Sequence, residues 1–258
     1  MFDNNSPSIR YGTSDTVRLH PRSTVLLMPA VVEGRRNSSH RIQTRKTSIK
    51  DMYVKVFKRA IDIFGAILGL LLLSPFLLLV ALALCFTTRG NPFFIQTRLG
   101  YRCKPFRIIK FKTMTDKKDV HGNLLPDELR VTKLGEFCRK LSLDEFPQLL
   151  NVLKGDMSLV GPRPWVPEQM EIFSAHECKC RGRLKPGMTG LAQVCGRNDI
   201  PFRERLPYDV WYVRNVSPLV DLKILWLTLG KVLKCDGIQQ RADALRKSKK
   251  KRRRPHKK

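Results

Sequence analysis

The chain has 258 residues and 42% of them are hydrophobic, so it can bury a core and is not disordered throughout. Its 49 Lys and Arg residues outnumber 22 Asp and Glu residues, giving a formal net charge of +27. This balance excludes an acidic-surfaced enzyme and indicates an anionic partner, either nucleic acid or an anionic membrane surface. Residues 1–50 carry +6 and residues 241–258 carry +10, which leaves +11 for residues 51–240.

The first 50 residues are polar and rich in Ser, Arg, Asn and Thr, and we expect them to be mostly disordered. Their apolar stretch at 25–32 begins too late and is too short for a signal-peptide core. The seven cysteines are odd in number and include no CxxC pair. Reduced thiols in a cytosolic compartment are therefore predicted, rather than a disulfide framework.

Residues 63–86 form an apolar run of 24 residues without a charge. As one helix this run would be about 36 Å long, enough to cross the hydrocarbon core of a bilayer. Ser74 and Pro75 lie at its centre, and a proline there removes a backbone hydrogen bond. Two topologies fit: a single pass with a kink, or a re-entrant helix that breaks at Ser74-Pro75. Basic residues flank both ends, and the positive-inside rule places both flanks in the cytoplasm.

The rest of the chain predicts an α+β domain that is predominantly helical. A polar loop is expected at 115–130, strands at 93–95 and 106–109, and helices at 131–154 (in two pieces), 169–183, 206–215 and 219–233. The last of these helices is amphipathic. It fits either a helix lying on a membrane interface or a helix facing the core.

The segment 142–148 reads Ser-Leu-Asp-Glu-Phe-Pro-Gln. Two local interpretations are open: a capping box from Ser142 to Glu145, or a helix N-cap at Asp144 with Pro147 in the first turn. A helix N-terminus can bind phosphate, and Arg139 adds a cationic donor just upstream. An aspartate in this position could attack phosphorus, and the neighbouring glutamate could hold a Mg²⁺ ion that also contacts substrate phosphates.

Three further segments combine basic residues with prolines, glycines or apolar residues. In Gly-Pro-Arg-Pro at 161–164, two prolines restrain Arg163, which suits bidentate phosphate binding. In Lys-Pro-Gly-Met-Thr-Gly at 185–190, the glycines either allow close approach of a ligand or make tight turns. Around Lys110 and Lys112, basic residues alternate with apolar ones, as they also do in an amphipathic strand near a membrane.

Together these segments resemble the bacterial sugar transferases that prime glycan assembly, the monotopic polyprenol-phosphate phosphoglycosyl transferases. The resemblance covers roughly residues 58–238, and the motifs occur in the family's order. They include Gln-x-Arg-x-Gly, Lys-Phe-Lys-Thr-Met, Ser-Leu-Asp-Glu-Phe-Pro-Gln, Gly-Asp-Met-Ser-Leu-Val-Gly-Pro-Arg-Pro and Lys-Pro-Gly-Met-Thr-Gly-Leu-Ala-Gln-Val. This chain departs from the family's usual residues at Cys103 (Gly), Lys112 (Arg) and Cys195 (Asn).

The resemblance implies an enzyme with a covalent intermediate. Asp144 would attack the β-phosphate of a UDP-sugar, release UMP and hold the phosphosugar until undecaprenyl phosphate, a polyprenol phosphate, displaces it. Glu145 would be associated with Mg²⁺. Arg139 and Arg163 resemble phosphate or nucleotide contacts. We add three cations as candidates for this role: Lys110 and Lys112 of the Lys-Phe-Lys-Thr-Met motif, and Arg197, which lies just after the segment 185–194.

The resemblance also implies the organisation of the chain. We expect a polar, mostly disordered segment at 1–50, a re-entrant membrane helix at 51–90, a small cytosolic catalytic domain with interfacial amphipathic helices at 91–238, and a basic disordered tail at 239–258. The enzyme would lie on the cytoplasmic face of the bacterial inner membrane, in contact with membrane lipids. It would start the synthesis of an exopolysaccharide, capsule, O-antigen or glycoprotein glycan, and a homodimer is left open.

Two other functions remain open from the sequence alone. One is a membrane glycosyl transferase that moves the sugar without its phosphate, which would release UDP instead of UMP. The other is a non-enzymatic, membrane-tethered nucleic-acid binder, suggested by the charge of +27. No recognisable nucleic-acid-binding signature accompanies that charge, so we expect no specific nucleic-acid partner.

Overall fold

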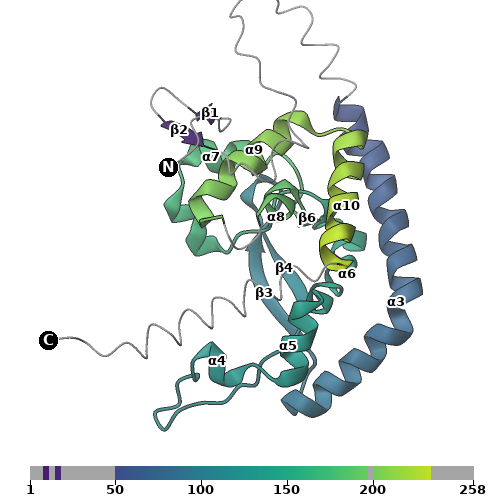
Figure 1. Cartoon of the computed structure of the whole chain (residues 1–258), viewed down its shortest axis with the longest axis vertical. Coiled ribbons are helices and arrows are strands. Elements are labelled where there is room, and N and C mark those ends of the chain that lie inside the picture. Colours follow the sequence, from purple (N-terminus) through teal and green to yellow (C-terminus); the bar gives the residue numbers. More distant parts are fainter. Residues whose placement is uncertain (1–7, 12–14, 19–49, 197–199, 234–258) are drawn as a thin grey trace, which may run out of the picture. The chain divides into compact units, whose positions relative to one another are not determined.

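The computed structural model describes residues 8–11, 15–18, 50–196 and 200–233 (Figure 1). The chain forms two compact units. Unit 1 comprises Met1–Leu71, Gln96–Ile108 and Gln148–Leu227, and unit 2 comprises Leu72–Ile95, Ile109–Pro147 and Thr228–Lys258. Helices dominate both units and short strands accompany them. The predicted α+β, predominantly helical fold class is therefore confirmed.

The N-terminal segment contains two short strands, β1 (Ser8–Tyr11) and β2 (Asp15–Arg18). They pair antiparallel, with Ile9 opposite Val17. Most of the segment 1–50 lies outside the described residues, so the expectation that it is mostly disordered stays a prediction. The predicted disordered tail at 239–258 lies outside the described residues.

Helix α3 (Lys58–Thr88) follows a π-helical turn at Tyr53–Phe57 and contains the apolar run. It stays helical through Ser74 and Pro75, so the expected break is not an end of the helix. Proline removes one donor from the helical ladder, but the Leu- and Ala-rich sequence on both sides strongly favours helix. The re-entrant path of this helix in a membrane stays a prediction.

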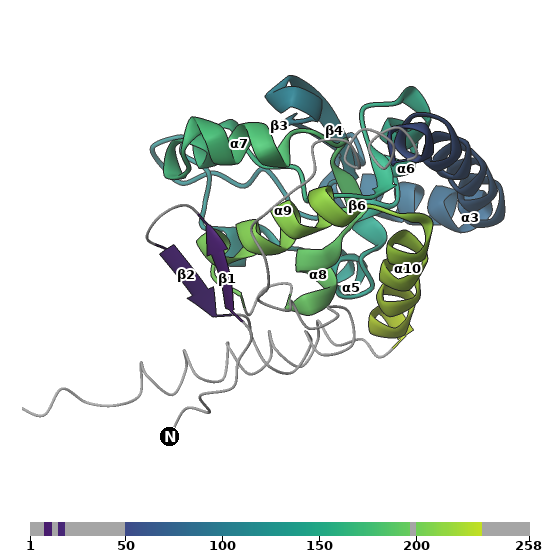
Figure 2. The same cartoon turned by 90° about the horizontal axis from the view of Figure 1, so that it is seen from above.

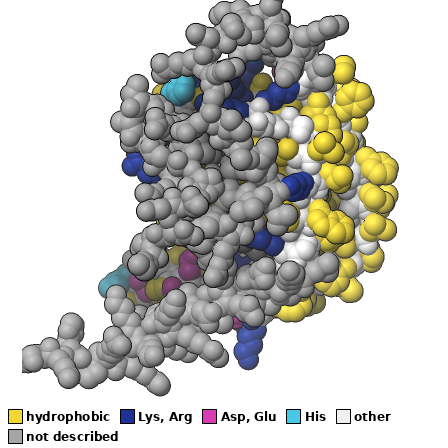
Figure 3. Space-filling view, turned by 45° about the horizontal axis from the view of Figure 1, so that its top comes forward, with side chains coloured by type: hydrophobic (Ala, Val, Ile, Leu, Met, Phe, Trp, Pro, Cys, Tyr) yellow, Lys and Arg dark blue, Asp and Glu magenta, His cyan; other side chains and the backbone are white. Residues whose placement is uncertain are grey.

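The helical stretch Lys50–Thr88, which includes α3, is long and apolar enough to cross a membrane, judged by length and composition. Only 17% of the residues in its most apolar window are buried, whereas the core helix of a water-soluble protein is mostly buried. Its exposed side chains include Phe64, Leu72 and Phe86. Figure 3 shows the hydrophobic side chains crowded over α3, on the right of the molecule.

Unit 1 is organised around a two-stranded parallel sheet, β5 (Ser158–Val160) with β6 (Gly187–Thr189). The α-helices of this unit include the first part of α3, α6 (Gln148–Lys154), α7 (Ala175–Arg181), α8 (Leu191–Cys195), α9 (Leu206–Asn215) and the first part of α10 (Pro218–Leu233). Helix α9 contributes to two buried clusters, one with α8 and one with α7 (Figure 2). Burial on both sides makes α9 the centre of the unit 1 core.

The predicted helix at 169–183 is wrong in its extent, because the segment forms two pieces. A 3-10 helix covers Pro167–Ile172, and α7 begins only at Ala175. Phe173 between them is extended, and Ser174 caps α7 in a capping box with Glu177. The local capping signal therefore starts a new helix where the apolar pattern alone suggested continuity.

Helix α10 confirms the predicted helix at 219–233 and shares features of both interpretations given to it. Ile224 is fully buried in the unit 1 core, whereas Leu222 and Trp226 are 65% and 75% exposed. Large exposed apolar side chains on a helix are typical of an interfacial helix. Within unit 1 this helix therefore has one face in the core and a second apolar face at the surface.

Strands β3 (Phe93–Leu99) and β4 (Pro105–Phe111) form a two-stranded sheet, and each is longer than the predicted strand. In unit 2, the polar loop that follows β4 ends in a short helix, α4 (Asp127–Arg130), which the prediction of a loop at 115–130 did not include. The predicted two-piece helix at 131–154 is confirmed. Its first piece is α5 (Lys133–Lys140), its second piece is α6, and a 3-10 turn, η3 (Leu143–Glu145), lies between them.

Candidate active site

The two acidic candidates lie in the 3-10 turn η3 and not at the start of a helix. Both capping interpretations are wrong: α6 begins at Gln148, and the Ser142 side chain makes no capping hydrogen bond. Ser142 has φ +57°. A residue in this left-handed conformation cannot continue a helix, so the chain leaves α5 and re-forms as a tight turn. Asp144 and Glu145 are thus presented by a turn between two short helices.

Hydrophobic contacts on both sides of the acidic pair hold this turn in place. Leu143 is buried in a unit 2 cluster, and Phe146 packs against the same cluster. The cluster also contains Cys138 and Phe111, together with residues from the second part of α3: Leu77, Val80 and Leu84. The apolar helix therefore supports the turn that carries the acidic side chains.

Two cations lie at the acidic pair, each from a different element of unit 2. Lys110 of β4 places its Nζ 3.1 Å from Oε1 of Glu145, and both side chains are only 16% exposed. Arg139 of α5 donates from Nε to Oγ1 of Thr113 over 2.7 Å. Positive charge is therefore held close to the turn by the strand end and by the preceding helix.

Gly135 allows α5 to approach the end of β4 this closely. A Cβ at Gly135 would lie 2.0 Å from the backbone oxygen of Thr113, well inside van der Waals contact. Thr132 caps the helix by accepting a hydrogen bond from the Gly135 N–H. This contact places Arg139, one turn further along α5, within reach of the Thr113 hydroxyl.

The electrostatic setting of Asp144 combines two opposing effects. Burial and the neighbouring Glu145 carboxylate raise the pKa of Asp144, while Lys110 and Arg139 act in the opposite direction. A carboxylate that is partly removed from water is a stronger nucleophile than a fully hydrated one, provided that it is ionised. The cations around the turn favour this ionised form.

The acidic turn fits Mg²⁺ better than it fits a metal that needs a complete protein cage. Within the described residues, no group of three or more His, Cys, Asp or Glu side chains could hold a metal ion. Mg²⁺ is commonly held by one or two carboxylates, with phosphate and water oxygens supplying the remaining ligands. Asp144 and Glu145 provide that kind of incomplete donor set.

Comparison with known proteins identifies the family. The family model described as bacterial sugar transferase matches residues 53–235. The chain belongs to this family. An uncharacterised sugar transferase of Bacillus subtilis, EpsL, is 50% identical over 186 residues, which cover 72% of this chain and 91% of that protein.

Two further relatives have more specific names. The exopolysaccharide production protein ExoY of Sinorhizobium fredii is 41% identical, over 69% of this chain and 85% of that protein. The UDP-glucose:undecaprenyl-phosphate glucose-1-phosphate transferase of Klebsiella pneumoniae is 42% identical, over 68% of this chain and 40% of that protein. The similarity to all three relatives supports the predicted resemblance to the sugar transferases.

The other cationic candidates of this sugar transferase are Lys112, Arg163 and Arg197. Lys112 is in unit 2 but pairs with Asp116, its Nζ 2.5 Å from Oδ2. Arg163 belongs to unit 1, where its backbone carbonyl accepts a hydrogen bond from Arg181. Arg197 lies outside the described residues.

The glycines of the 185–190 segment of the transferase pack against backbone. A Cβ at Gly187 would lie 2.0 Å from the backbone nitrogen of Gly161, and a Cβ at Gly190 would lie 2.1 Å from the Gly161 oxygen. These contacts join the Gly-Pro-Arg-Pro segment to the strand pair β5–β6. The close approach that only glycine allows is therefore between two parts of the chain.

Sequence reasoning missed two residues that organise these segments. Thr113, which binds Arg139, lies inside the quoted Lys-Phe-Lys-Thr-Met motif, so its position was a usable signal. Arg181 had no such signal. It pairs with the buried Asp209 at 2.7 Å and lies 3.8 Å from the ring centre of Trp165, and these partners come from distant parts of unit 1.

Proposed function

We propose that this sugar transferase moves a sugar-1-phosphate from a UDP-sugar to undecaprenyl phosphate, with release of UMP. The product would be a polyprenol diphosphate sugar, the first membrane-bound intermediate of a glycan such as an exopolysaccharide. The names of the Klebsiella and Sinorhizobium relatives support this substrate pair and this kind of pathway.

The observation that carries the proposal is the partly buried Asp144, next to Glu145 and influenced by two cations. Lys110 and Arg139 both favour the ionised carboxylate of Asp144. Reactions at a diphosphate need a nucleophile and positive charge close together, because negative charge develops on the phosphate oxygens in the transition state. The acidic turn provides both within a single unit.

The reaction would proceed in two displacements at the β-phosphorus. A carboxylate oxygen of Asp144 attacks this phosphorus, a new P–O bond forms, and the bond to the bridging oxygen breaks, so that UMP leaves with the electron pair. An oxygen of undecaprenyl phosphate then attacks the same phosphorus and releases the Asp144 carboxylate. A covalent intermediate allows the soluble donor and the lipid acceptor to use one site in turn.

Each remaining candidate would stabilise charge. Lys110 and Arg139 would contact the phosphates of the donor, with Lys112, Arg163 and Arg197 as further cationic contacts. Glu145 would hold a Mg²⁺ ion, which supplies charge neutralisation at the substrate phosphates when it is bound. The catalytic residues would work at the cytoplasmic face of the inner membrane, where α3 would anchor the enzyme by a re-entrant path.

The intermediate can be tested directly. The full chain in neutral detergent is mixed with Mg²⁺ and a panel of UDP-sugars without acceptor, and the peptide that contains Asp144 is analysed by mass spectrometry. We expect a mass increase of one phosphosugar, one UMP released per modified chain, and loss of the modification when undecaprenyl phosphate is added. Release of UDP from an unmodified chain would contradict the proposal and favour a glycosyl transferase instead.

A further inference from the structure

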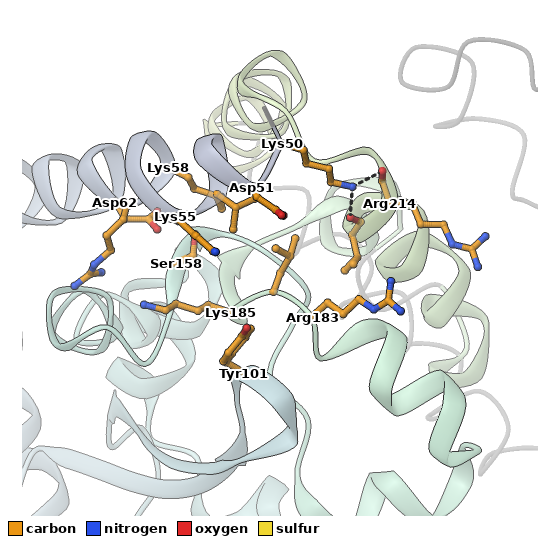
Figure 4. A pocket seen from close by; sticks show the side chains of 14 residues that line it. Lys50, Asp51, Lys55, Lys58, Asp62, Tyr101, Ser158, Arg183, Lys185 and Arg214 are labelled. Carbon is orange, nitrogen blue, oxygen red and sulfur yellow. Dashed lines mark hydrogen bonds between the residues drawn. The ribbon is translucent and has the colours of Figure 1, made fainter. Parts of the chain in front are cut away.

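A second charged region lies entirely within unit 1. It is a pocket of about 570 Å³, a size typical of small-ligand sites. It is formed by the start of the α3 helical stretch (50–62), by Tyr101 and Ser158, and by segments at 183–185 and 213–214 (Figure 4). None of the residues predicted to bind the donor's phosphates or nucleotide lines it. The pocket is therefore separate in composition from the acidic turn.

The pocket carries a large excess of positive charge. Two acidic residues line it, Asp51 and Asp62, against seven cations: Lys50, Lys55, Lys58, Arg59, Arg183, Lys185 and Arg214. Asp62 is 3% exposed and is already engaged, since it accepts hydrogen bonds from the Ser158 hydroxyl and the Leu159 N–H. Neither carboxylate can therefore neutralise the pocket as a whole.

Three of these cations have structural partners within unit 1. Lys58 pairs with Asp221 at 2.6 Å, Lys50 donates to two backbone carbonyls of α9, and Arg59 donates to the carbonyls of Val152 and Leu153. By contrast, the side chains of Lys55, Arg183 and Lys185 form no hydrogen bond or ion pair with any residue that the structure describes. These three side chains are available to an anion.

Two of the available cations, Lys55 and Lys185, extend into the same part of the pocket. Lys55 comes from the turn before α3, Lys185 comes from the segment before β6, and Figure 4 shows both extending into the pocket from opposite sides. The Cβ position of Gly155 would lie 3.4 Å from Nη2 of Arg59 and 3.5 Å from Nζ of Lys185, so these two cations flank one point of the backbone. Burial and the Arg59 charge lower the pKa of Lys185. A bound anion would relieve this repulsion.

The composition of the walls indicates what kind of anion fits. Val54, Leu184 and Val213 add apolar surface among the cations. The helix that supplies Lys55 also exposes Val56, Phe57 and Ile61 at the same turns, just before the apolar run. A cationic pocket with apolar walls at the start of a membrane-type helix matches a phosphate group attached to an acyl chain or glycerol backbone.

We propose that this pocket is a second phosphate-binding site of the transferase, and that a membrane lipid with a net negative charge, such as phosphatidylglycerol, supplies the phosphate. Lys55 and Lys185 bind the lipid phosphate, Arg183 contacts another part of the anionic headgroup, and the apolar walls contact the glycerol backbone. The site fixes the start of α3 at the headgroup level of the cytoplasmic leaflet.

The reactivity of the Lys185 amine can be used to measure whether the site is occupied. The full chain in neutral detergent is titrated with phosphatidylglycerol, and the rate at which an amine-reactive reagent labels Lys185 is followed by peptide mass spectrometry. A lowered pKa leaves more of the Lys185 amine neutral and reactive, so a bound phosphate slows labelling by contact and by raising that pKa. Lys179, exposed on α7, is the reference lysine and keeps its rate.

A double variant tests the proposed contacts. In Lys55→Gln/Arg183→Gln, the lipid concentration that half-protects Lys185 rises by about 30-fold, because each cation near an anionic lipid contributes about fivefold to binding. The charge-matched control is Lys104→Gln/Arg107→Gln, which removes one exposed lysine and one exposed arginine outside the pocket. This control keeps wild-type protection.

The source of the phosphate is separated by the choice of ligand. Phosphatidylglycerol protects Lys185, whereas phosphatidylcholine, soluble glycerol phosphate and UDP do not at the same concentration. Equal protection by glycerol phosphate or UDP would overturn the lipid assignment. Labelling that stays unchanged in saturating phosphatidylglycerol, or an equal loss of protection in both double variants, would overturn the site itself.

The proposal stands apart from the transfer reaction, because labelling requires no turnover. The Asp144→Asn chain keeps wild-type protection of Lys185 by phosphatidylglycerol even though it is expected to be inactive. Loss of protection in this variant would show that the pocket is not independent of the acidic turn and would overturn the proposal.

Discussion

The acidic turn of unit 2 and the basic pocket of unit 1 both concentrate charge, but they hold it differently. At the turn, Lys110 is paired with Glu145 and Arg139 is hydrogen-bonded to Thr113. In the pocket, Lys55, Arg183 and Lys185 have no such partner among the described residues, although seven cations face two acids. Charge held by partners suits chemistry at a defined geometry, whereas unpaired charge suits the capture of an anion.

The largest expected effect tests whether the acidic turn performs the chemistry. Asp144→Asn keeps the shape of the side chain but removes the nucleophilic oxygen charge, so UMP release should fall by at least about 10³-fold. The measurement is UMP formation with a UDP-sugar and undecaprenyl phosphate. Asp127→Asn, an exposed acid of the same unit, is the matched control and should retain activity. Substantial UMP release from Asp144→Asn would contradict the nucleophile assignment.

The same substitution has an opposite effect on stability. Because burial raises the pKa of Asp144, ionising it in the folded state lowers the free energy of unfolding as the pH rises above the ordinary aspartate range. Asp144→Asn should therefore unfold at a higher temperature than the wild type at neutral pH. The difference should vanish at a pH below the ordinary aspartate pKa. If Asp144→Asn were less stable than the wild type at neutral pH, the ionised Asp144 carboxylate would not be destabilising, and this prediction would be wrong.

The next largest effect concerns the pocket's structural cations. Asp221 accepts hydrogen bonds from Lys58, Tyr53 and Tyr212, and all four side chains are buried. Asp221→Ala leaves a buried lysine without its counter-charge and should lower the free energy of unfolding by about 3–5 kcal/mol. Denaturant titration in detergent measures this change.

An exposed ion pair provides the control for Asp221. The Asp127 side chain is 70% exposed in its pair with Arg130, so Asp127→Ala should change the free energy of unfolding by less than about 1 kcal/mol. Similar losses in both variants would mean that burial does not distinguish the structural cation Lys58 from a surface charge.

A smaller effect tests how the cations of the turn are held. Gly135→Ala places a methyl carbon 2.0 Å from the Thr113 backbone oxygen, so α5 must shift and the free energy of unfolding should fall by about 1–3 kcal/mol. Arg139 moves with the helix, and UMP release should fall as well. Gly90→Ala, where a Cβ meets nothing within 4 Å, is the control. An active, fully stable Gly135→Ala chain would contradict the close contact.

The pH dependence tests the electrostatics of the acidic pair. The reactive form of Asp144 is the carboxylate, so the first step should accelerate as the pH rises through the pKa of Asp144. Glu145→Gln removes the like charge that raises this pKa, so the acid limb of the residual activity should move to lower pH. Single-turnover UMP release at a series of pH values measures the position of this acid limb. An acid limb that moves to higher pH would contradict the coupling.

The smallest effect concerns a turn beside the pocket. Cys103, where the resemblance leads us to expect a glycine, has φ +58°, a conformation that glycine adopts without strain. Cys103→Gly should therefore raise the free energy of unfolding by about 0.5–1 kcal/mol, partly offset by loss of the weak Sγ contact to the Cys178 oxygen. Cys180→Gly, in the helix α7, is the contrasting variant and should destabilise. A lower free energy of unfolding in Cys103→Gly would contradict backbone strain at Cys103.

Much of the local structure follows from the sequence. The uncharged run at 63–86 predicts an apolar helix that is kinked or broken at Ser74-Pro75, and α3 covers the whole run and stays helical through that point. Helices α9 and α10 occupy the predicted ranges, because their apolar periodicity is a local property of the chain. The acidic pair was found through its motif, and the family match supports that resemblance.

Local signals failed where neighbours decide the conformation. The capping rules predicted that a helix starts at Ser142 or Asp144. The structure instead has a 3-10 turn there, and Leu143 on this turn and Phe146 directly after it pack into the unit 2 cluster. The glycines at 185–190 could serve a ligand or a turn by pattern alone. Only the tertiary structure shows that they face the backbone at Gly161.

The sequence by itself determined the family and the apolar helix, and it predicted the pair Asp144–Glu145 as the site, because each depends on residues that are adjacent or regularly spaced. Only the tertiary structure decided which cations lie at that pair and which have no partner among the described residues. The pocket joins residues 50–62 to segments more than 100 residues later, and such contacts arise from packing that no local pattern encodes. Of the charge excess that first indicated an anionic partner, the part in the described residues thus includes cations at the acidic turn and cations of the pocket that we propose to bind a phosphate.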